Sequence, residues 1–500
     1  MQGSCLCNPG LWLTYVQVYR GLCPTKPLPN PRYAAVRTLV EPREGPEVNI
    51  VDSDALVLYF PGPKTATGED VLELHVHGGP ATVKAVLTAI PKSPSSETIR
   101  YAEPGEFTKR AFLNNRLDLA QVESLGDILA AETEQQRKSA VRGASGVLGR
   151  TYEDWRGELL LARGEIEALI DFSEDQHFDE SPTELLANVT RLVTDMLHSI
   201  RLYRDGSQRS ELLRHGIRIA LLGPPNVGKS SLMNLIVGRE ASIVSSEAGT
   251  TRDIVEASLD IRGYLCSFAD TAGIRTHSSS RASPYDSESS SIGAVEEEGI
   301  RRARKKAKDS DVIIVLASVE HDQRGQPRLR YDIETLHLAS SAQQCLIAIN
   351  KCDVVDHQTL SALVHGFKQS VLGNIPGLGC PEPVSISCTT AESPAVGLTD
   401  PGKIDALTER LVQSFSKLTS LPDDMQHLLG VTERQSQLLK QCQRHLEEFM
   451  AEAATGGTAE EPDIVLAAEH LRHAANCLAA ITGRGEFDDV EEVLGVIFEK

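Results

Sequence analysis

The eight residues Gly223-Pro-Pro-Asn-Val-Gly-Lys-Ser230 decide the fold of the central part of this 500-residue chain. They match the pattern G-x-x-x-x-G-K-S/T, and they lie between an apolar, strand-like run over 217–222 and a helix-compatible run over 231–237. In such a loop the backbone N–H groups turn toward the phosphates of a nucleotide, Lys229 reaches the β and γ oxygens, and the Ser230 hydroxyl is placed for magnesium. The sequence therefore predicts an α/β domain with a P-loop.

Three further motifs follow in the order that a guanine-nucleotide site requires. Gly249-Thr-Thr-Arg-Asp253 lies at the spacing of switch I. Asp270-Thr-Ala-Gly273 follows a strand-like run, where its carboxylate can take magnesium through water and its last N–H can approach the γ-phosphate. Asn350-Lys-Cys-Asp353 follows another apolar run, and Asp353 would accept the N1 and N2 hydrogens of guanine, a charge-assisted pair that adenine cannot offer. Ser387-Cys-Thr389 is similar to the loop that backs the base, so we expect GTP as the nucleotide.

The predicted nucleotide contacts come from these motifs. They are Gly223, Asn226, Val227, Gly228, Lys229, Ser230, Ser231, Gly249, Thr250, Thr251, Asp270, Thr271, Ala272, Gly273, Asn350, Lys351, Asp353, Ser387, Cys388 and Thr389. Of these, Ser230 and Thr251 are the predicted magnesium ligands. Many GTPases orient the attacking water with a Gln directly after the D-x-x-G glycine, but here that position is Ile274. The acidic run Glu296-Glu-Glu298 is one candidate to replace it, and the alternative is that this run is the solvated first turn of a helix.

Composition limits the classes of protein that this chain can be. Five hundred residues predict roughly two to four domains, and no stretch approaches the ~20 apolar residues of a membrane span. The formal charge of −20 argues against a surface that grips nucleic acid by itself, so an RNA substrate would need a partner that holds it. The ten cysteines show no C-x-x-C spacing, which favours reduced thiols. Residues 1–40 carry basic and no acidic residues, as a transit peptide does, but they are rich in Pro and Gly and show no clean amphipathic helix.

The pattern along the chain predicts a multidomain α+β and α/β protein. Short apolar runs between turns predict an α+β domain over 27–116, after an unaligned segment over 1–26. Helical periodicity fills 117–215 and returns over 421–500, on either side of the alternating strands and helices of 216–420. We therefore expect a discontinuous helical domain into which a Ras-like P-loop GTPase domain is inserted.

Several motifs together resemble one known family. Asn226 in the P-loop and Ala248-Gly-Thr-Thr-Arg-Asp253 are similar to the tRNA modification GTPases of the MnmE/TrmE type, which include mitochondrial relatives. The flanks Thr67-Gly-Glu-Asp-Val-Leu-Glu-Leu-His-Val-His-Gly-Gly-Pro80 and Glu103-Pro-Gly-Glu-Phe-Thr-Lys-Arg-Ala-Phe-Leu-Asn-Asn-Arg-Leu-Asp-Leu-Ala-Gln121 resemble the N-terminal domain of that family and its entry into the helical domain. The resemblance extends from about Pro27 to the C-terminus.

The resemblance implies cofactors and site residues that the motifs alone do not. The N-terminal domain would bind a 5-formyl- or methylene-tetrahydrofolate, with Glu73 and Arg116 at two of the folate positions. The G domain would dimerise across its nucleotides and be stimulated by potassium, which neutralises developing charge as an arginine finger does. The implied potassium ligands are Asn226, Ser245, Glu247 and Thr250, and Ser245 also joins the GTP-binding residues. The implied catalytic residue that orients water is Glu296, with its register open within 296–298.

The implied function is GTP hydrolysis in the modification of carbon 5 of the wobble uridine of tRNAs. The implied partners are a second copy of the chain, through its N-terminal and G domains, and an FAD-containing protein, with tRNA bound indirectly. The mitochondrion is the implied compartment, with the cytoplasm as the alternative. Family members carry a Gly-rich opening and a Cys-x-Gly-Lys tail, whereas this sequence has Met1 to Lys26 and ends in Phe498-Glu-Lys500, so we expect the differences to bear on folate binding and modification rather than on GTP binding.

Two alternatives remain open at this point. One is a regulatory or assembly GTPase that binds RNA or the ribosome without a modification role, which a basic RNA-binding appendage would favour. The other is a folate-binding interaction module without activity, which the intact nucleotide motifs speak against. The sequence does not indicate which tRNAs are modified, or whether glycine, ammonium or taurine is the second substrate.

Overall fold

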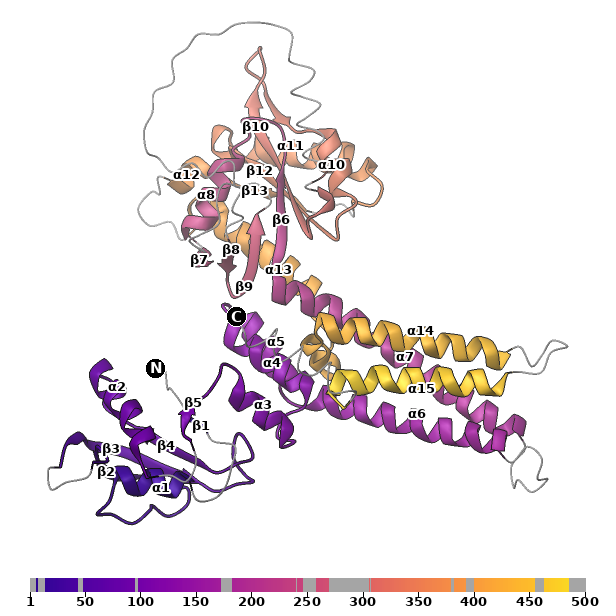
Figure 1. The fold of residues 1–500 in the computed structure, drawn as a ribbon. Coiled ribbons are helices and arrows are strands. Elements are labelled where there is room, and N and C mark those ends of the chain that lie inside the picture. The colour runs from indigo at the N-terminus through magenta and orange to yellow at the C-terminus, as the bar shows by residue number, and fades with distance from the viewer. Residues whose placement is uncertain are drawn as a thin grey trace, which may run out of the picture. The chain divides into compact units, whose positions relative to one another are not determined.

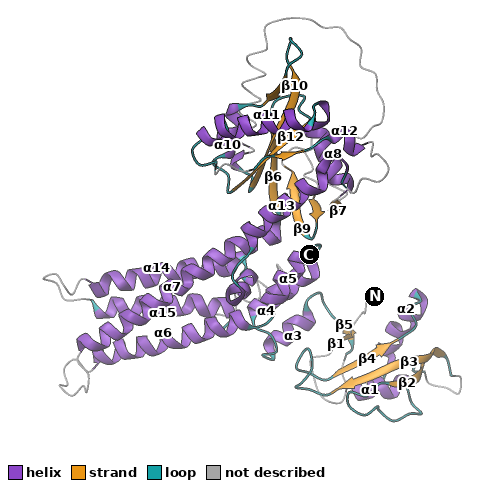
Figure 2. Ribbon diagram, turned by 180° about the vertical axis from the view of Figure 1, so that it is seen from behind, coloured by secondary structure: helices purple, strands orange, loops and turns teal. Residues whose placement is uncertain are grey.

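The computed structural model describes most of the chain in two compact units (Figures 1 and 2). The described residues are 6–7, 14–43, 48–94, 98–171, 182–239, 241–245, 258–268, 305, 307–378, 382–392, 400–454 and 463–484. One unit comprises Met1–Gly126, Ala144–Leu197 and Gln437–Lys500, and the other comprises Asp127–Gly143 and His198–Ser436. Among the described residues, no helix is both long enough and apolar enough to cross a bilayer.

The first unit begins with a small α+β fold around a three-stranded antiparallel sheet of order β2-β3-β4. Its elements are α1 (Thr14–Leu22), β2 (Ala35–Val40), β3 (Ile50–Phe60), β4 (Val71–His75), α2 (Pro80–Ala89), η1 (Ile90–Lys92) and α3 (Glu106–Leu113), with β1 (Leu6–Cys7) paired to β5 (Arg100–Tyr101). Alternate residues of β3, namely Ala55, Val57 and Tyr59, are buried, as expected for a sheet with one covered face. The α+β character predicted for this region is therefore present.

Helix α1 corrects one expectation about the N-terminal segment. The sequence showed no clean amphipathic helix there, yet α1 buries Val18, Tyr19 and Leu22 in the same core as Leu39 of β2. Tyr19 is also fixed by its hydroxyl, which donates to the carbonyl of Pro27 at 2.7 Å. A nine-residue helix offers too few turns for its period to stand out, and tertiary packing decides its formation.

The rest of the first unit is helical. Its helices are α4 (Leu119–Ala130), α6 (Val147–Asp171), α7 (Pro182–His215), α14 (Glu433–Ala454) and α15 (Ile464–Thr482), of which α4, α7 and α14 continue into the second unit. Helix α15 packs along α6, as both ribbon views show. On α6, Leu159 and Ile166 are fully buried, whereas Leu161 faces solvent. The spacing of seven residues between the buried pair matches two turns of one helix face.

The second unit is built on an eight-stranded sheet of order β13-β12-β10-β6-β9-β8-β7, with β11 paired to β10. The strands are β6 (Ile217–Leu222), β7 (Ala241–Ser245), β8 (Ser258–Ile261), β9 (Tyr264–Phe268), β10 (Val312–His321), β11 (Pro327–Arg330), β12 (Gln344–Asn350) and β13 (Val384–Ser385). The pairs of β6 with β9 and β10, of β10 with β12, and of β12 with β13 are parallel. Parallel strands place the loops after their carboxyl ends at one edge, where ligands bind in such folds.

Helices cover both faces of this sheet, and β10 divides its side chains between them. Val312, Ile314 and Leu316 belong to the core that includes α8 (Lys229–Arg239) and α13 (Ile404–Thr419). The intervening residues belong to a second core that includes α10 (Ile333–Ala339) and α11 (His357–Ser370). A strand buried on both sides reads as a continuous apolar run, which is the pattern that the sequence shows over 312–319.

Short elements complete the second unit. They are α5 (Glu134–Gly143), η3 (Cys352–Val354), η4 (Leu372–Asn374), α12 (Cys388–Glu392), η5 (Pro401–Lys403) and η6 (Asp423–Gly430). Helix α5 is fixed to η6, because the Ser139 hydroxyl donates to the carbonyl of Leu429 at 2.5 Å and Arg142 donates to Gln426 at 2.6 Å. The compact unit thus contains helical residues from before the predicted range 216–420 as well as the strands within it.

Candidate guanine-nucleotide site

The predicted P-loop lies between β6 and α8, and two of its glycines are required by their surroundings. Gly223 has a φ of 146°, and a Cβ there would lie 2.3 Å from the carbonyl oxygen of Leu316 in β10. Gly228 has a φ of 99°, and a Cβ there would lie 2.2 Å from Nδ2 of Asn350. Only glycine tolerates both the backbone conformation and the approach. The loop is therefore packed against the middle of β10 and the end of β12.

The charged and polar side chains of the P-loop lie at or next to the first turn of α8. The Lys229 ammonium donates to the carbonyl oxygens of Gly223 at 2.8 Å and of Pro224 at 2.7 Å. Asn226 takes a left-handed conformation with a φ of 66°, which asparagine tolerates better than most residues, and its side chain is exposed. The exposed Ser230 is in the first turn of α8. The ammonium of Lys229, the amide of Asn226 and the hydroxyl of Ser230 thus lie near the N-terminus of α8, whose free backbone N–H groups attract phosphate.

Asn350 joins the phosphate loop to the base loop. Its side chain is 3% exposed at the end of β12. The amide Nδ2 donates to the carbonyl of Val227 at 2.8 Å, and the amide Oδ1 accepts from the backbone N–H of Cys388 at 3.1 Å. An amide side chain carries its donor and its acceptor on two separate atoms, so it can bridge two backbone groups. The predicted motif residue therefore holds two loops in register.

Asp353 is exposed and has one of its two oxygens fixed by the protein. The Ser387 hydroxyl donates to Asp353 Oδ1 at 2.6 Å, and Ser387 Oγ accepts from the backbone N–H of Thr390 at 3.1 Å. The neighbouring Lys351 has a φ of 61°, and its ammonium lies 3.3 Å from Glu320 Oε1. A carboxylate aimed in this way suits the paired N1 and N2 hydrogens of guanine.

Gly402 also shapes the base loop, and the sequence analysis missed it. Its carbonyl accepts from the N–H of Ser387 at 3.0 Å, and with a φ of 81° a Cβ there would lie 2.2 Å from the carbonyl oxygen of Ser387. The Pro401-Gly402 pair is a turn signal in the sequence, but a turn signal alone does not say what the turn faces.

Cys388 contributes its backbone N–H to the site rather than a reactive thiol, because burial raises the pKa of its thiol to about 11.

The described residues thus bring together the P-loop, Asn350, Asp353 and the base loop. Ser245 ends β7, but its side chain lies outside what the structure describes. The remaining predicted residues of switch I, the D-x-x-G motif and the catalytic position also lie outside the described residues. They are Glu247, Gly249, Thr250, Thr251, Asp270, Thr271, Ala272, Gly273 and Glu296.

The two predicted folate residues lie in the N-terminal part of the first unit. Glu73 is on β4, and its Oε2 lies 3.1 Å from Nε2 of His75. Arg116 follows α3, and its Nε donates to the carbonyl of Thr65, in the loop between β3 and β4, at 3.0 Å. The structure thus ties Arg116 to a backbone carbonyl rather than to Glu73.

The loop geometry defines a class of protein. A P-loop whose neighbouring base loop presents a serine-held Asp353 is the nucleotide site of a P-loop GTPase domain. Two family models together match residues 14–500 apart from 117 and 118. The model described as "GTP-binding protein TrmE N-terminus" matches residues 14–116, and the model described as "MnmE helical domain" matches residues 119–500. The chain belongs to the MnmE/TrmE family of tRNA modification GTPases, which confirms the resemblance seen in its motifs.

Relatives in bacteria and in mitochondria match nearly the full chain. The tRNA modification GTPase MnmE of Rhodopseudomonas palustris is 36% identical over 474 residues, which cover 95% of this chain and 90% of that protein. The human mitochondrial 5-taurinomethyluridine-tRNA synthase subunit GTPB3 is 35% identical over 487 residues, covering 96% and 86%. The mitochondrial tRNA modification GTPase MSS1 of Saccharomyces cerevisiae is 33% identical over 498 residues, covering 97% and 87%. The first family model begins at residue 14, within the segment that the sequence analysis left unaligned.

Proposed function

We propose that this protein hydrolyses GTP in the modification of carbon 5 of the wobble uridine of tRNA. The observation that carries the choice of nucleotide is the chain of contacts from the Val227 carbonyl through Asn350 to the Cys388 N–H, with Asp353 held beside it by Ser387. This arrangement suits guanine, because Asp353 accepts two hydrogens that adenine lacks in that pattern. The names of the relatives support the link to tRNA modification.

Residues of the P-loop would position the triphosphate. Backbone N–H groups at the start of α8 face the phosphates, and Lys229 exchanges its carbonyl partners for phosphate oxygens that carry full charge. The hydroxyl of Ser230, in the first turn of α8, fits a magnesium ion, for which we propose Thr251 as the second protein ligand and Asp270 as a ligand through water. Magnesium, when bound, neutralises charge on the β and γ phosphates.

Potassium would do the work of an arginine finger, a role that the sequence assigns to no particular arginine. We assign its ligands to Asn226, Ser245, Glu247 and Thr250, and the orientation of the attacking water to Glu296. The exposed Asn226 at the turn of the P-loop supports this assignment, because its amide oxygen is a suitable hard ligand for a cation at the phosphates. The presence of Ile274 where many GTPases have Gln also leaves the water without its usual guide.

The proposed reaction also needs protein partners, a one-carbon donor and a compartment. A second copy of the chain would pair with the N-terminal and G domains, and an FAD-containing protein would hold the tRNA, which agrees with the net charge of −20. A 5-formyl- or methylene-tetrahydrofolate would supply the one-carbon unit near Glu73 and Arg116. The two eukaryotic relatives described above are mitochondrial, which supports that compartment for this chain.

The test of nucleotide choice is steady-state hydrolysis of GTP, ATP and xanthosine triphosphate by the full chain. We expect GTP to be preferred over ATP, and we expect Asp353→Asn to move the preference toward xanthosine triphosphate, because xanthine carries a carbonyl in place of the guanine amine and asparagine offers a donor to it. Equal turnover of GTP and ATP by the unmodified chain would refute the assignment of the base loop.

The test of the cation is hydrolysis in potassium against sodium buffer, with Asn226→Ala beside the unmodified chain. Stimulation by potassium that disappears in the variant supports the assigned ligands, and equal turnover in both salts refutes them. The tRNA proposal is tested by mass spectrometry of wobble uridine after incubation of tRNA with the chain, its FAD-containing partner, folate, GTP and, in separate reactions, glycine, ammonium or taurine. Unchanged uridine in the complete mixture, from a chain that still hydrolyses GTP, would separate the GTPase from the modification role.

A further inference from the structure

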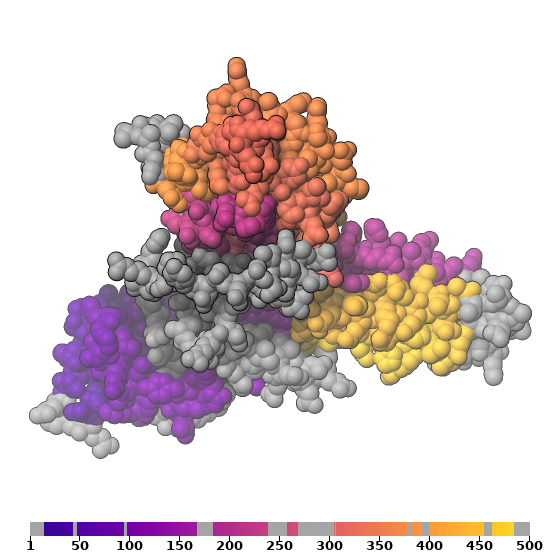
Figure 3. Space-filling model, turned by 90° about the horizontal axis from the view of Figure 1, so that it is seen from above, coloured from indigo at the N-terminus to yellow at the C-terminus, as the bar shows by residue number. Residues whose placement is uncertain are grey.

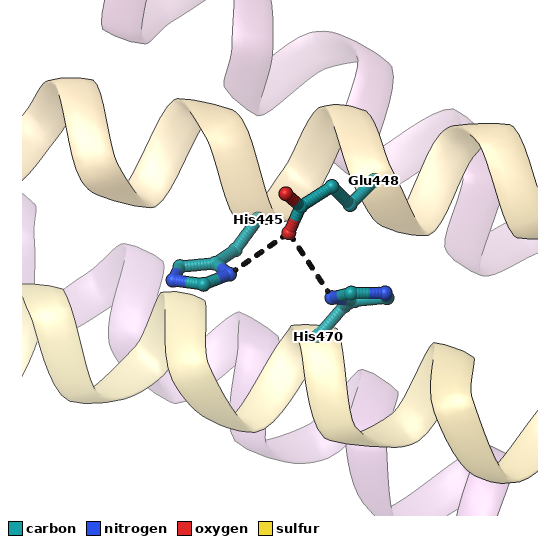
Figure 4. A group of neighbouring side chains, drawn as sticks. All are labelled: His445, Glu448 and His470. Atoms are coloured by element: carbon teal, nitrogen blue, oxygen red, sulfur yellow. Dashed lines mark hydrogen bonds and ion pairs between the residues drawn. The ribbon is translucent and has the colours of Figure 1, made fainter.

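Two helices of the first unit bring three metal-binding side chains to one point, far from the nucleotide motifs in the sequence. His445 and Glu448 are one turn apart on α14, and His470 is on α15 (Figure 4). Nδ1 of His445 lies 3.2 Å from Oε2 of Glu448, and Nδ1 of His470 lies 3.3 Å from the same oxygen. The three donor atoms all lie within 4.8 Å of one another. Both imidazoles therefore converge on a single carboxylate oxygen.

These distances fit the edges of a tetrahedral metal site. Zinc binds histidine nitrogen and carboxylate oxygen at about 2.0–2.1 Å, so neighbouring donors around a tetrahedral ion lie roughly 3.3 Å apart. The two edges that involve Glu448 already have this length. The donor atoms of the two imidazoles lie within 4.8 Å of each other, so this edge must shorten by at most about 1.5 Å to reach the tetrahedral length.

The surroundings leave the two imidazoles ready to accept a cation. Within the described residues, His470 Nδ1 is buried and makes no hydrogen bond, and its ion-pair contact of 3.3 Å with Glu448 Oε2 is the one that a metal ion would replace. Arg444 lies 3.7 Å from the other oxygen of Glu448, and the ring of His473 stacks on that of His445 with centroids 5.2 Å apart. These neighbours restrict the orientation of two of the three donors, as outer contacts do in metal sites.

The cluster is reachable from solvent. The side chains of His445 and His470 are 18% and 16% exposed, and that of Glu448 is 43% exposed. The space-filling view shows residues of α14 and α15 along the surface of this region (Figure 3). Because the Glu448 side chain is the most exposed of the three, water would complete the coordination from its side.

We propose that His445, Glu448 and His470 bind one divalent transition-metal ion of the zinc class, with two nitrogen donors, one oxygen donor and water. Imidazole with carboxylate suits zinc, cobalt and nickel better than magnesium or calcium, which prefer oxygen ligands alone. The ion would join α14 to α15. It would thereby stabilise the C-terminal pair of helices in a way that does not depend on nucleotide.

The experiment is a cobalt titration of the full chain, stripped of metal and free of nucleotide, followed by displacement with zinc. Cobalt bound to nitrogen and oxygen donors gives visible absorption without the sulfur-to-cobalt charge-transfer band of a thiolate site. The variants are Glu448→Gln, which keeps the shape of the side chain, and His470→Asn. The matched control is Glu447→Gln on the adjacent residue, whose Oε1 accepts from Gln443. Any cobalt bound in the GTPase domain is common to all four proteins and cancels in the comparison.

We expect one equivalent of cobalt in the unmodified chain and in Glu447→Gln, and at least tenfold weaker binding in the two site variants. Zinc should raise the melting temperature of the unmodified chain and of Glu447→Gln but not of Glu448→Gln, and matching circular dichroism spectra establish that the variants are folded. The proposal is overturned if the unmodified chain binds no cobalt or if all variants bind it equally. Cys442 is a buried free thiol one turn before His445 on α14. The proposal is also overturned by a charge-transfer band that disappears in Cys442→Ser, because the metal would then be held by thiols.

Discussion

Replacement of Asn350 by alanine should loosen the whole nucleotide edge of the sheet. The change removes the donor to the Val227 carbonyl and the acceptor for the Cys388 N–H, at a position that is 3% exposed. Each buried group left without a partner costs about 1–3 kcal/mol, so Asn350→Ala should destabilise the second unit by about 2–6 kcal/mol. For domains of this size, 1 kcal/mol lowers the melting temperature by roughly 2–4 °C. A fall of at least 4 °C is therefore expected.

The same substitution should also lower the affinity of the protein for guanine nucleotides. Without the Asn350 amide, the base loop loses its link to the P-loop, so the phosphate and base contacts are no longer held at a fixed separation. The assay combines thermal unfolding of the nucleotide-free chain with titration of a fluorescent GDP analogue. The matched control is Asn374→Ala, because the exposed Asn374 amide donates only to the carbonyl of Ser370 at 2.9 Å. A melting temperature and a GDP affinity for Asn350→Ala that equal those of the control would refute the reasoning.

Three further predictions concern stability. Gly402→Ala should destabilise the second unit by more than 1 kcal/mol and weaken GDP binding, since its Cβ would lie 2.2 Å from the Ser387 carbonyl oxygen at a φ of 81°. Gly366→Ala, in the exposed interior of α11 with nothing within 4 Å of the new Cβ, should instead stabilise by about 0.5–1 kcal/mol in thermal unfolding. Burial would raise the pKa of Asp52, but hydrogen bonds from His77 outweigh it and the pKa is lowered. The stability that this carboxylate contributes is present above about pH 4 and is lost as the pH falls through its folded-state pKa, so Asp52→Asn should lose more stability at pH 6 than at pH 3 in urea unfolding.

For each of these three substitutions, one result would contradict the prediction. A stabilised Gly402→Ala would mean that the backbone there relaxes without cost, and a destabilised Gly366→Ala would mean that α11 is not a regular helix at that position. For Asp52, an equal difference between the two proteins at both pH values would remove the carboxylate from the acid response.

The nucleotide domain was predictable because its signals are local. The apolar run of β6, the glycines of the P-loop and the helix-compatible residues of α8 are contiguous, so pattern and motif agree on one strand, one loop and one helix. The role of Asp353 also follows from its motif. Its positioning by Ser387 does not, because the serine lies 34 residues away and only the parallel pairing of β12 with β13 brings the two together.

The features that could not be predicted from the sequence depend on how elements far apart in the chain pack against one another. Gly402 is an ordinary turn residue until its distance to Ser387 is known. The i, i+3 pair of His445 and Glu448 is visible on a predicted helix, but the third member comes from another helix whose rotation about its axis no local pattern fixes. Helix α1 was missed for a related reason, because its burial is decided by the sheet on which it packs.

The packing of α15 on α6 sets an order of events during synthesis. The two helices are separated by roughly 290 residues, and the nucleotide domain lies between them in the chain. At about 5–20 residues per second, a ribosome needs about 15–60 s to proceed from the end of α6 to the start of α15. During that time the apolar face of α6 that includes Leu159 and Ile166 lacks its final cover, while the strands of the nucleotide domain emerge and pair. For most of its synthesis the new chain therefore exposes an uncovered apolar helix face to the chaperones that act at the ribosome.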